Sequence, residues 1–452
     1  MAAVLRRPAS SLAGTSLKPL TSSIVRHYAT SIPARAHHRV VIIGGGTAGV
    51  TVAAQLRRLG GEFKKDEIAI LDPAQDHHYQ PGWTLVGSGL KSLSSMSRSL
   101  PSVIPAGVQH YPLQVSSFDP ANNVVKTSEG VDVTYDYLIV APGLETNFSG
   151  IPGLPEALQD PSSLVSSIYS NKTAEQVWKN IQGFKAGQAI FTQPAGVIKC
   201  AGAPQKIMWM ALSQWKRDGV RNNIQAAFAT GAPAMFAVPK YSQALERLRQ
   251  ERNVEGLFQH NLVSVQAKNK VATFKDLANN GKEVQREFGF LHVVPPQKAW
   301  DWVAKSPLAD AAGWVDVDKS TTQHTKYPNV FSIGDASGLP SSKTAAAISS
   351  QAPVLVDNLL AAMRGADLKA GYSGYASCPL LTGHGELMLC EFKYGGVPAE
   401  TFAGIFGSQD KPKRVFYHLK KDAFPLVYFN SFLKGTWFGP NSFFRPKTQA
   451  SA

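Results

Sequence analysis

A glycine-rich turn between an apolar strand and a helix constrains the fold of this chain more than any other feature. Residues 39–56 run from the strand Val-Val-Ile-Ile through the turn into the helical pattern Val-Thr-Val-Ala-Ala-Gln-Leu. Four glycines form the turn: Gly44, Gly45, Gly46 and Gly49. Their spacing lets the backbone approach a pyrophosphate, which the positive end of the helix stabilises. Asp72 ends the next predicted strand, where an acceptor for ribose hydroxyls belongs, so the sequence predicts an α/β dinucleotide-binding domain.

A second predicted strand, at residues 187–194, opens another α/β unit that lacks the expected turn. Such a strand normally leads into a second Gly-x-Gly-x-x-Gly loop. Here it leads into Ala-Gly-Val-Ile-Lys-Cys-Ala-Gly-Ala-Pro-Gln-Lys over residues 195–206. The missing glycines argue against NAD(P) binding at this position. Cys200 suggests instead an electron donor that is handled by sulfur chemistry.

Two distant segments indicate that the first domain binds FAD. One ends in Ala-Pro-Gly143 and the other in Ser-Ile-Gly334-Asp335, and together they resemble the two-dinucleotide-binding flavoprotein superfamily. The resemblance implies that the acid of Gly-Asp contacts the ribityl or pyrophosphate portion of FAD. The helix that follows would point its positive end at the pyrimidine ring, a field that favours the anion formed on reduction. This helix starts with Lys343, Thr344, Ala345 and Ala346.

Six segments carry a closer resemblance, to sulfide:quinone oxidoreductase of the mitochondrial type. They are residues 77–84, 197–206, 291–296, 334–335, 343–346 and 375–380. The resemblance covers nearly everything from Arg39 onward, and the segments around Cys200 and Cys378 are specific to the family. It implies that these two cysteines form a redox-active pair beside the flavin. It also implies that Gln80 contacts FAD and that the backbone of Val115 contacts the adenine.

The resemblance further implies a chemistry for the pair. Hydrosulfide attacks an oxidised cysteine bridge, either a disulfide or a trisulfide, and leaves a persulfide on one cysteine and a thiolate on the other. We expect Cys378 to take the sulfide first and Cys200 to be the flavin-facing thiolate. Lys199, next to Cys200, either helps to keep this thiolate ionised or faces solvent. Electrons then pass to ubiquinone, and glutathione, sulfite or cyanide removes the sulfane sulfur. Cys390 is expected to be a buried structural thiol.

The chain of 452 residues is long enough for two domains with sizeable cores. The predicted fold class is α/β, with two Rossmann-like dinucleotide-binding domains in tandem and an irregular amphipathic C-terminal region that binds the membrane. The expected order is a mitochondrial presequence (1–38), the first part of the FAD-binding domain (39–155), a second Rossmann-like domain that does not bind NAD (156–295), the second part of the FAD-binding domain (296–370) and the C-terminal region (371–452).

The composition of the first 38 residues predicts import into mitochondria. This segment is rich in Ser and Ala and contains five basic residues but no acidic residue, and the first acid of the chain is Glu62. That is the composition of a presequence, and cleavage is expected after Tyr28. Four positive charges precede that position, so the net charge of +14 becomes 14 − 4 = +10 after cleavage. A basic protein of this kind has nucleic acid or an anionic membrane as its natural partner.

The C-terminal region favours the membrane. Residues 410–447 contain eight Lys or Arg and two Asp, interleaved with ten aromatic residues. Basic side chains attract anionic head groups while aromatic side chains enter the acyl boundary, although about a third of these aromatics should close the core. Pro425 and Pro440 should divide the region into two short amphipathic helices. Because no run of 18 apolar residues occurs, the contact with inner mitochondrial membrane lipids should be peripheral or monotopic.

Other partners and activities fit the sequence less well. No nucleic-acid motif is present, so nucleic acid is not expected, and a homodimer is left open. No histidine near the motifs has metal-ligand spacing with cysteine or carboxylate, so no metal is expected, and His292 is either a proton carrier to quinone or a structural histidine. A type II NADH:quinone dehydrogenase would need a second glycine loop. The presequence and the membrane-binding region argue against a soluble flavocytochrome-linked sulfide dehydrogenase, which would need neither. The presence of both cysteines argues against a flavin-binding scaffold that has lost catalysis.

Overall fold

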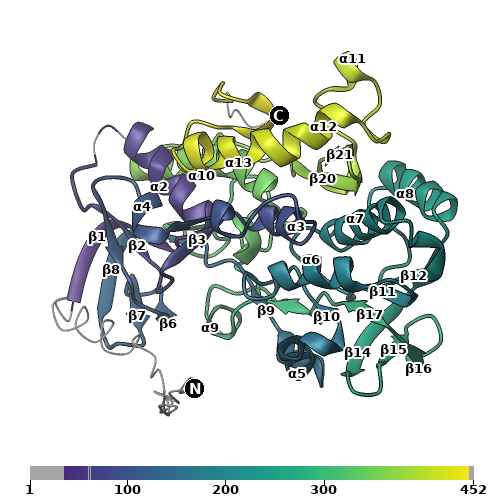
Figure 1. The fold of residues 1–452 in the computed structure, drawn as a ribbon. Coiled ribbons are helices and arrows are strands. Elements are labelled where there is room, and N and C mark those ends of the chain that lie inside the picture. Colours follow the sequence, from purple (N-terminus) through teal and green to yellow (C-terminus); the bar gives the residue numbers. More distant parts are fainter. Residues whose placement is uncertain (1–34, 60, 62, 447–452) are drawn as a thin grey trace, which may run out of the picture.

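The computed structural model describes residues 35–446 apart from 60 and 62, and a seven-stranded sheet forms its first domain (Figure 1). The strand order is β5-β2-β1-β8-β7-β6, with β19 paired to β8. β5, β2, β1, β8 and β19 pair in parallel, whereas β6, β7 and β8 pair antiparallel. The strands are β1 (Arg35–Ile43), β2 (Ile68–Leu71), β5 (Val108–Tyr111), β6 (Val115–Asp119), β7 (Val124–Thr127), β8 (Asp132–Val140) and β19 (Val330–Ser332).

The inner strands of this sheet are apolar because both of their faces are covered. Val40 to Ile43 of β1 are buried, as in a central strand of a parallel sheet. Helices α2 (Thr47–Leu59) and α10 (Ala345–Met363) contribute to the core on one side. The segment after residue 296 supplies β19, so this part of the chain returns to the first domain. β1 begins at Arg35, within the range assigned to the presequence, and the expected cleavage position lies outside the described residues.

The second α/β unit is built on a five-stranded parallel sheet of order β10-β17-β11-β12-β13, with a three-stranded antiparallel sheet beside it. The chain enters and leaves this unit through a paired connection of two short strands, β9 and β18. The elements are β9 (Glu145–Thr146), β10 (Val165–Ser166), β11 (Gly187–Gln193), β12 (Ile224–Thr230), β13 (Val254–Phe258), β14 (His260–Gln266), β15 (Val271–Asp276), β16 (Lys282–Glu287), β17 (Phe290–His292), β18 (Gln297–Lys298), α6 (Ala174–Gly183), α7 (Ala203–Arg217) and α8 (Pro239–Glu251).

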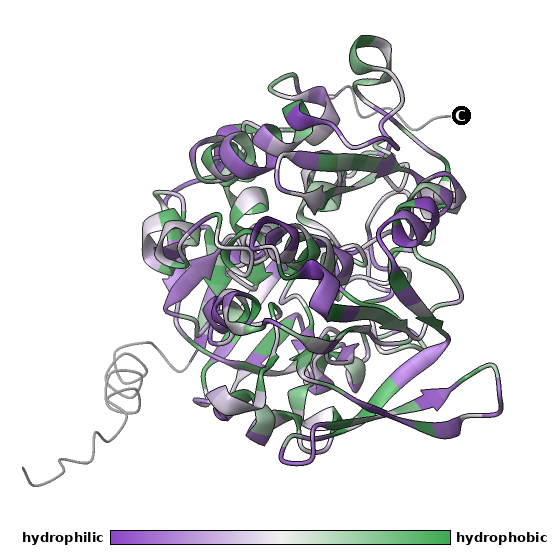
Figure 2. Cartoon of the chain, turned by 45° about the vertical axis from the view of Figure 1, so that its right-hand side comes forward, coloured by the Kyte–Doolittle hydropathy of each residue, from purple (hydrophilic) through white to green (hydrophobic). Residues whose placement is uncertain are grey.

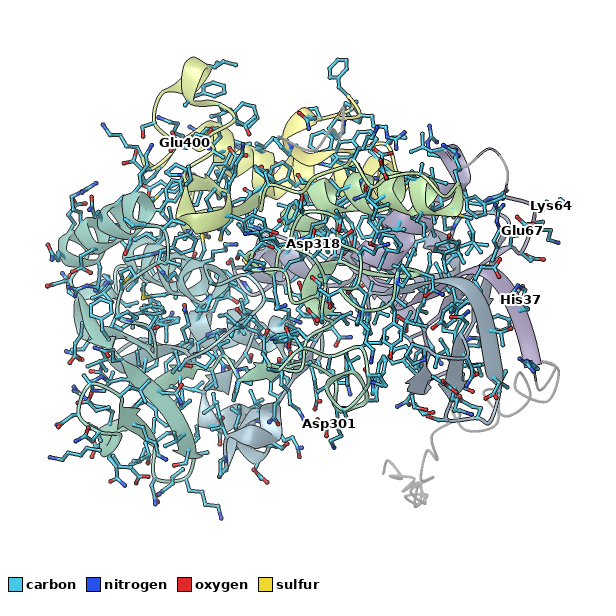
Figure 3. All side chains as sticks on the ribbon, turned by 180° about the vertical axis from the view of Figure 1, so that it is seen from behind. His37, Lys64, Glu67, Asp301, Asp318 and Glu400 are labelled. Carbon is cyan, nitrogen blue, oxygen red and sulfur yellow. The ribbon has the colours of Figure 1, made fainter. Side chains whose placement is uncertain are left out.

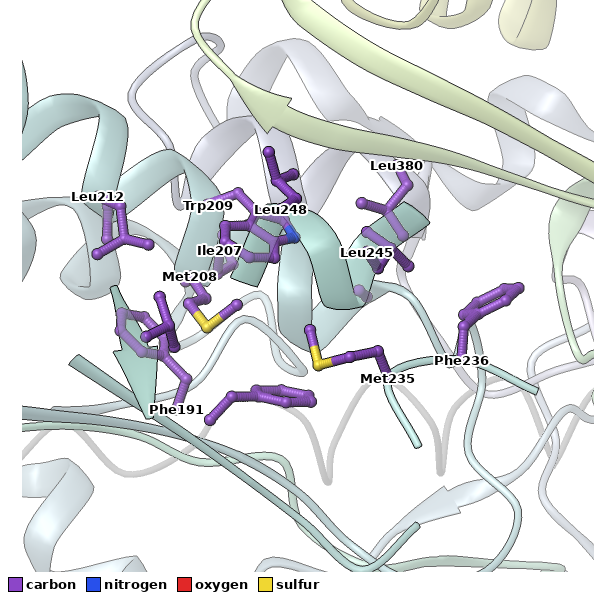
Figure 4. Packing of buried hydrophobic residues seen from close by; sticks show 14 of the residues in the cluster. Phe191, Ile207, Met208, Trp209, Leu212, Met235, Phe236, Leu245, Leu248 and Leu380 are labelled. Carbon is purple, nitrogen blue, oxygen red and sulfur yellow. The ribbon is translucent and has the colours of Figure 1, made fainter. Parts of the chain in front are cut away.

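A single core joins this unit to the start of the C-terminal region. Phe191 of β11, Trp209 of α7 and Leu380 are buried in the same cluster (Figure 4). Leu380 belongs to β20 (Ala376–Gly383), which forms an antiparallel hairpin with β21 (Glu386–Phe392). The region beyond Gly371 was expected to be irregular, and this hairpin corrects that expectation. Nearly every residue of β20 is buried, so the strand lacks the alternation of apolar and polar residues that would reveal it.

The C-terminal region continues in short helical turns that lie beside α10 and α2 (yellow in Figure 1). Pro425 and Pro440 were expected to divide this region into two short helices, and this is wrong at Pro425, which lies inside α13 (Phe424–Val427), a short helix that follows α12 (Arg414–His418). Two π-helical turns, η8 (Leu419–Ala423) and η9 (Tyr428–Phe432), join them into one run, which was not expected. Pro425 fits into this run because it occupies the first turn of α13, where a missing N–H costs little.

The ten aromatic residues of this region contribute more to the core than the sequence suggested. Five of them are buried, and only Phe443 and Phe444 are exposed. The expected share of about a third was too low because the helical run packs inward against both domains. The buried five are Phe416, Tyr417, Tyr428, Phe432 and Phe438. Within residues 35–446 no helix is long and apolar enough to cross a membrane.

Short elements complete the described chain. They are β3 (Asp76–His78), β4 (Ser97–Ser99), α3 (Trp83–Val86), α4 (Leu100–Val103), α5 (Leu154–Gln159), α9 (Asp301–Ala304), α11 (Ala403–Phe406) and the 3-10 turns η1 (Gln80–Gly82), η2 (Ser94–Met96), η3 (Phe148–Gly150), η4 (Pro161–Ser163), η5 (Arg221–Asn223), η6 (Gly334–Ala336), η7 (Tyr394–Gly396) and η10 (Gly439–Asn441). Figure 2 shows hydrophobic residues concentrated on the inner strands. Figure 3 shows charged side chains such as Lys64 and Asp301 at the edge of the molecule, where ion pairs contribute little to stability.

Candidate active site

The glycine turn between β1 and α2 is packed too closely for side chains. Gly44 has a φ of +99°, and a Cβ on Gly49 would overlap the Gly44 carbonyl oxygen. Gly46 instead faces open space, so the turn offers bare backbone to a ligand. The Gly45 amide donates to Asp72 Oδ2 at 2.6 Å, which fixes the carboxylate directly after β2 beside the turn.

A cavity of about 520 Å³ opens beside this turn. Its wall contains eleven of the predicted FAD-binding residues: Gly44, Gly45, Gly46, Asp72, Gln80, Gly143, Asp335, Lys343, Thr344, Ala345 and Ala346. Gly49 lies inside the turn, Gly334 adopts a φ of +73° next to Asp335, and Val115 lies in β6 among buried residues of the first domain. A bare-backbone turn, a fixed carboxylate and two helix N-termini in one wall fit FAD.

The N-terminus of α10 forms another part of this wall. Thr344 caps the helix, because its Oγ1 accepts a hydrogen bond from the Ala347 amide at 3.1 Å. The ammonium of Lys343 donates to the carbonyl oxygens of Asp335 and Ser337 at 2.7 and 3.0 Å. Burial lowers the pKa of Lys343 to about 8. The lysine thus ties the Gly-Asp turn to the start of the helix and keeps both at the cavity.

The segment after β11 places Cys200 in the cavity wall where a second glycine loop would otherwise lie. Cys200 has a φ of +52°, a left-handed conformation that costs an L residue about 1–2 kcal/mol. Its amide donates to the Lys343 carbonyl at 2.8 Å, and its carbonyl accepts from the Ala203 amide at 2.7 Å. These two bonds hold the strained backbone and fix the thiol relative to the start of α10.

The two cysteines singled out in the sequence lie side by side, although they are 178 positions apart in the chain. Cys200 Sγ lies 3.8 Å from Cys378 Sγ of β20, and both are free thiols. This separation is longer than an S–S bond of about 2.05 Å. Gly202 makes the approach possible, because a Cβ at that position would overlap the Cys378 sulfur.

Hydrogen bonding and positive charge distinguish the two thiols. The hydrogen bond from the Cys378 thiol, followed by the charge of Lys206, lowers the pKa of Cys200 well below its usual range. The same thiol–thiol bond raises the pKa of Cys378. Lys206 is buried in α7 and donates to Cys200 Sγ at 3.2 Å. Cys200 is therefore the thiolate of the pair, while Cys378 keeps its proton.

A second buried lysine lies near the pair. The ammonium of Lys420 donates to the Pro81 carbonyl at 3.3 Å and lines the cavity. Burial and, after it, the like charge of Lys206 lower its pKa to about 7, against the opposing effect of the two cysteines. Lys420 therefore carries its charge below about pH 7 and loses it as the pH rises.

Lys206, and not Lys199, supports the Cys200 thiolate. Lys199 Nζ donates to Gln80 Oε1 at 2.9 Å and lies 5.3 Å from the centre of the Trp83 ring. The sequence-based assignment to Lys199 relied on adjacency along the chain, but neighbouring side chains point in different directions. The sequence does contain a signal for Lys206, because it is the only charged residue in the mostly apolar first turns of α7.

Replacing Lys206 with methionine should raise the pKa of the Cys200 thiol. The change removes a buried positive charge and its hydrogen bond to the thiolate, so we expect a shift of at least about one pH unit. The measurement is the rate of iodoacetamide labelling of Cys200 in reduced protein across the pH range, read by peptide mass spectrometry. Lys199→Met is the matched control and should leave the profile unchanged. An unshifted profile in Lys206→Met would contradict the assignment.

Cys390 and His292 are both buried in the protein interior. Cys390 lies opposite Cys378 in the hairpin and is fully buried, which raises its pKa and keeps it protonated. His292 is also fully buried; its Nε2 accepts from the Ile168 amide at 3.2 Å, and burial lowers its pKa to about 3. This favours the structural reading of His292 over a proton carrier. Among the described residues no three His, Cys, Asp or Glu side chains are grouped to hold a metal ion.

A hydrogen-bonded relay that the sequence did not reveal joins the glycine turn to the C-terminal run. His77 Nδ1 lies 2.9 Å from the Gly45 carbonyl oxygen, and His77 Nε2 lies 2.7 Å from the hydroxyl of Tyr428. Thr47 Oγ1 lies 2.7 Å from the same hydroxyl. His77 was recognised only as part of a motif. Its partner stands 351 positions further along the chain, so no local pattern connects them.

This chain is similar over most of its length to known enzymes. Residues 38–192 match the pyridine nucleotide-disulphide oxidoreductase family. The chain is 47% identical to the mitochondrial sulfide:quinone oxidoreductase of Schizosaccharomyces pombe, over 96% of this chain and 98% of that protein. It is 42% identical to the mitochondrial sulfide:quinone oxidoreductase of Mus musculus, over 92% of this chain and 90% of that protein.

The fold comparison gives the same architecture. The crystal structure of the sulfide:quinone oxidoreductase from Aquifex aeolicus superposes with a TM-score of 0.71 at 20% identity, covering 87% of this chain and 92% of that one. A likeness at this identity speaks for the fold alone. The identity to the two mitochondrial enzymes over nearly the whole chain decides the assignment. This chain belongs to the mitochondrial sulfide:quinone oxidoreductase family, an oxidoreductase family.

Proposed function

We propose that this protein oxidises hydrogen sulfide at Cys200 and Cys378, passes two electrons through FAD to ubiquinone and transfers the sulfane sulfur to a small nucleophile such as glutathione, sulfite or cyanide. One observation carries the proposal: two thiols lie 3.8 Å apart, and Cys200 lies in the wall of the cavity that contains the glycine turn and the start of α10. The names of the relatives supply sulfide and quinone as substrates and the mitochondrion as the location.

The residues of the cavity wall would hold FAD at defined points. The backbone of the glycine turn and the N-terminus of α2 would bind the pyrophosphate. Asp72 accepts amide hydrogen bonds from Gly45 and Ala74, which orient its carboxylate for ribose hydroxyls. The positive end of α10 would face the flavin ring. When bound, FAD accepts two electrons at a time and passes them on to quinone.

The difference in acidity between the two thiols sets the direction of sulfide attack. In the oxidised protein a bridge joins Cys200 and Cys378, and hydrosulfide attacks the sulfur of Cys378. The bond to Cys200 breaks because the sulfur with the lower pKa is the better leaving group. The new S–S bond makes Cys378 a persulfide, and the electron pair of the broken bond stays on Cys200 as a thiolate beside Lys206.

Transfer of the outer sulfur completes the cycle. The acceptor nucleophile attacks the terminal sulfur of the persulfide, and the S–S bond breaks to leave a second thiolate on Cys378. The two thiolates re-form the bridge by giving up two electrons, which FAD would accept when bound and pass to ubiquinone. Lys206 and Lys420 give this end of the cavity positive charge, which attracts hydrosulfide and stabilises the thiolates. The attraction weakens above about pH 7, where Lys420 loses its charge.

The exposed apolar surface supports contact with the membrane. All large apolar side chains that are exposed among the described residues lie in the C-terminal region, apart from Val197 and Leu277. They are Val397, Ile405, Phe406, Val415, Leu426, Phe443 and Phe444. Exposed basic residues such as Arg414 and Lys434 lie among them and suit anionic lipid of the inner mitochondrial membrane.

Removing two exposed aromatics should weaken membrane binding. In Phe443→Ser/Phe444→Ser we expect at least about tenfold weaker binding to anionic vesicles, because burial of a large apolar side chain contributes about 1.5–3 kcal/mol. Vesicle flotation measures this, and turnover with a water-soluble short-chain quinone should stay unchanged. Leu277→Ser, on the second domain, is the matched control. Equal flotation of wild type and double variant would place the contact elsewhere.

Anaerobic mixing tests the proposed function. Sulfide should bleach the visible absorbance of the purified yellow protein, and a short-chain ubiquinone added next should restore it. NADH should leave the absorbance unchanged, since no second glycine loop follows β11. Bleaching by NADH but not by sulfide would overturn the proposal in favour of a type II NADH:quinone dehydrogenase.

A further inference from the structure

The C-terminal run of helical turns closes one side of the cofactor cavity. We infer that residues 414–433, which we call the strap, form a gate that must lift before FAD can enter or leave, and that Tyr428 is its latch. The inference rests on the FAD binding proposed above. It concerns how the cofactor is retained and gives Tyr428 a positioning role outside the sulfur chemistry.

The strap supplies part of the cavity wall. Tyr428 lies within it and is only 2% exposed, and its ring is tilted against that of Tyr79, another wall residue, with the ring centres 4.5 Å apart. The strap residues that line the cavity are Leu419, Lys420, Phe424, Val427, Tyr428 and Phe432. Opposite ends of the chain therefore meet at the cavity: its glycine turn comes from β1 and α2, and its cover from the last helical turns.

The latch is a directed chain of hydrogen bonds. The Gly45 carbonyl can only accept, so His77 Nδ1 carries the proton in their 2.9 Å contact. Burial lowers the pKa of His77, so the ring is neutral and its Nε2 is an acceptor. Tyr428 therefore donates its hydroxyl proton to Nε2 at 2.7 Å, and Thr47 donates to the Tyr428 oxygen at 2.7 Å. The Tyr428 hydroxyl thus links the strap to the glycine turn in two ways, through His77 to Gly45 and directly to Thr47.

The other attachments of the strap are made by side chains. Among the described residues no backbone–backbone hydrogen bond joins residues 414–433 to the chain before Lys413. Side chains provide the links. Phe416, Tyr417 and Phe432 are buried in clusters shared with the rest of the molecule, and Lys420 donates to the Pro81 carbonyl at 3.3 Å. Nearer the surface, Lys91 pairs with Asp422 at 3.5 Å, and the Arg98 guanidinium lies 4.2 Å from the centre of the Phe429 ring. Exposed contacts of these kinds contribute little. Leu426, at 65% exposure, marks the outer side of the strap.

The gate predicts a kinetic signature. Tyr428→Phe keeps the ring packing but removes the hydroxyl, and the buried His77 Nε2 loses its partner. Losing such a bond is enough for a change of about tenfold in the rate of strap opening. Since the latch bonds are made between protein groups, FAD release and FAD rebinding should both accelerate by about tenfold, and the Kd should change by less than about twofold.

The experiment uses purified holoenzyme. Release is followed by the fluorescence of freed FAD after dilution, and rebinding by its quenching when FAD is mixed with apoprotein. The matched control is Tyr417→Phe, another buried tyrosine of the strap, whose rates should equal those of wild type. Unchanged rates in Tyr428→Phe would overturn the latch. Faster release with an equally weakened Kd would also overturn it, because Tyr428 would then simply contact the cofactor.

A second measurement guards against a general loss of stability. Limited trypsin digestion should cut after Lys421 within the strap, and after Lys434 directly behind it, faster in Tyr428→Phe than in wild type, while cutting elsewhere stays the same. Equal or uniformly faster digestion would count against a local gate. The test is separable from the proposed function: a wild-type protein that purifies without FAD would refute that function, whereas holoenzymes with equal release rates would refute only the strap.

Discussion

Replacing Cys378 with serine should reduce sulfide-dependent ubiquinone reduction by at least about 10³-fold, and Cys200→Ser should do the same, since removal of an essential nucleophile commonly costs this much or more. A serine oxygen can form neither the bridge nor the persulfide, so the first S–S exchange is lost. FAD content should remain near that of wild type, because Cys378 lies outside the predicted cofactor-binding set. Steady-state quinone reduction with sulfide at saturation measures the effect.

Cys390→Ala is the matched control for these variants. It removes a third thiol from the same hairpin, directly opposite Cys378, but one that burial keeps protonated. We expect turnover within about twofold of wild type and a loss of stability of about 1 kcal/mol for the vacated volume. A collapse of activity in Cys390→Ala, or substantial turnover in either serine variant, would contradict the assignment of the pair.

Adding one methyl group at Gly202 should separate the two sulfurs. In Gly202→Ala the new Cβ would overlap the Cys378 sulfur, so one of them must move. A misplacement of about 1 Å at a reacting group can cost about 10²-fold in rate, and we expect a loss of this size in sulfide oxidation. The backbone itself tolerates alanine, because Gly202 has a φ of −89°. Stopped-flow bleaching of the flavin by sulfide measures the loss.

Gly183→Ala provides the comparison. Gly183 ends α6, its Cβ would meet no atom within 4 Å, and its backbone is not left-handed. The substitution should leave sulfide oxidation unchanged and raise the melting temperature slightly, because alanine favours a helix over glycine. If Gly202→Ala also retained full activity with a normal melting temperature, the close approach of Gly202 to Cys378 would not be required for sulfide oxidation.

The parts of the site that follow from local sequence were predictable. The glycine turn needs a strand before it and a helix after it, and all three lie within residues 35–59. The absence of a second such turn after β11 is equally local, and it makes Cys200 a candidate for sulfur chemistry. The pairing of Cys200 with Cys378 was predicted by family resemblance alone, since spacing along the chain says nothing about two residues on different elements.

The parts that depend on tertiary packing were not predictable. Lys206 contacts Cys200 because α7 starts directly after the cysteine and turns that side chain back toward the sulfur. Tyr428 contacts His77 because the last helical run crosses the first domain. The strand β20 was missed because burial on both faces removes the alternating pattern by which strands are recognised.

Peptide mapping of the oxidised enzyme tests the central claim most directly. Trypsin should release Cys200 on residues 200–206, and Cys378 together with Cys390 on residues 370–393. Digestion without reductant should yield these two peptides joined by a disulfide or a trisulfide, with fragment ions locating the bond at Cys378. Brief exposure to sulfide should separate them and leave a persulfide on Cys378. A bond to Cys390, or unlinked thiols in enzyme that turns over, would contradict the account.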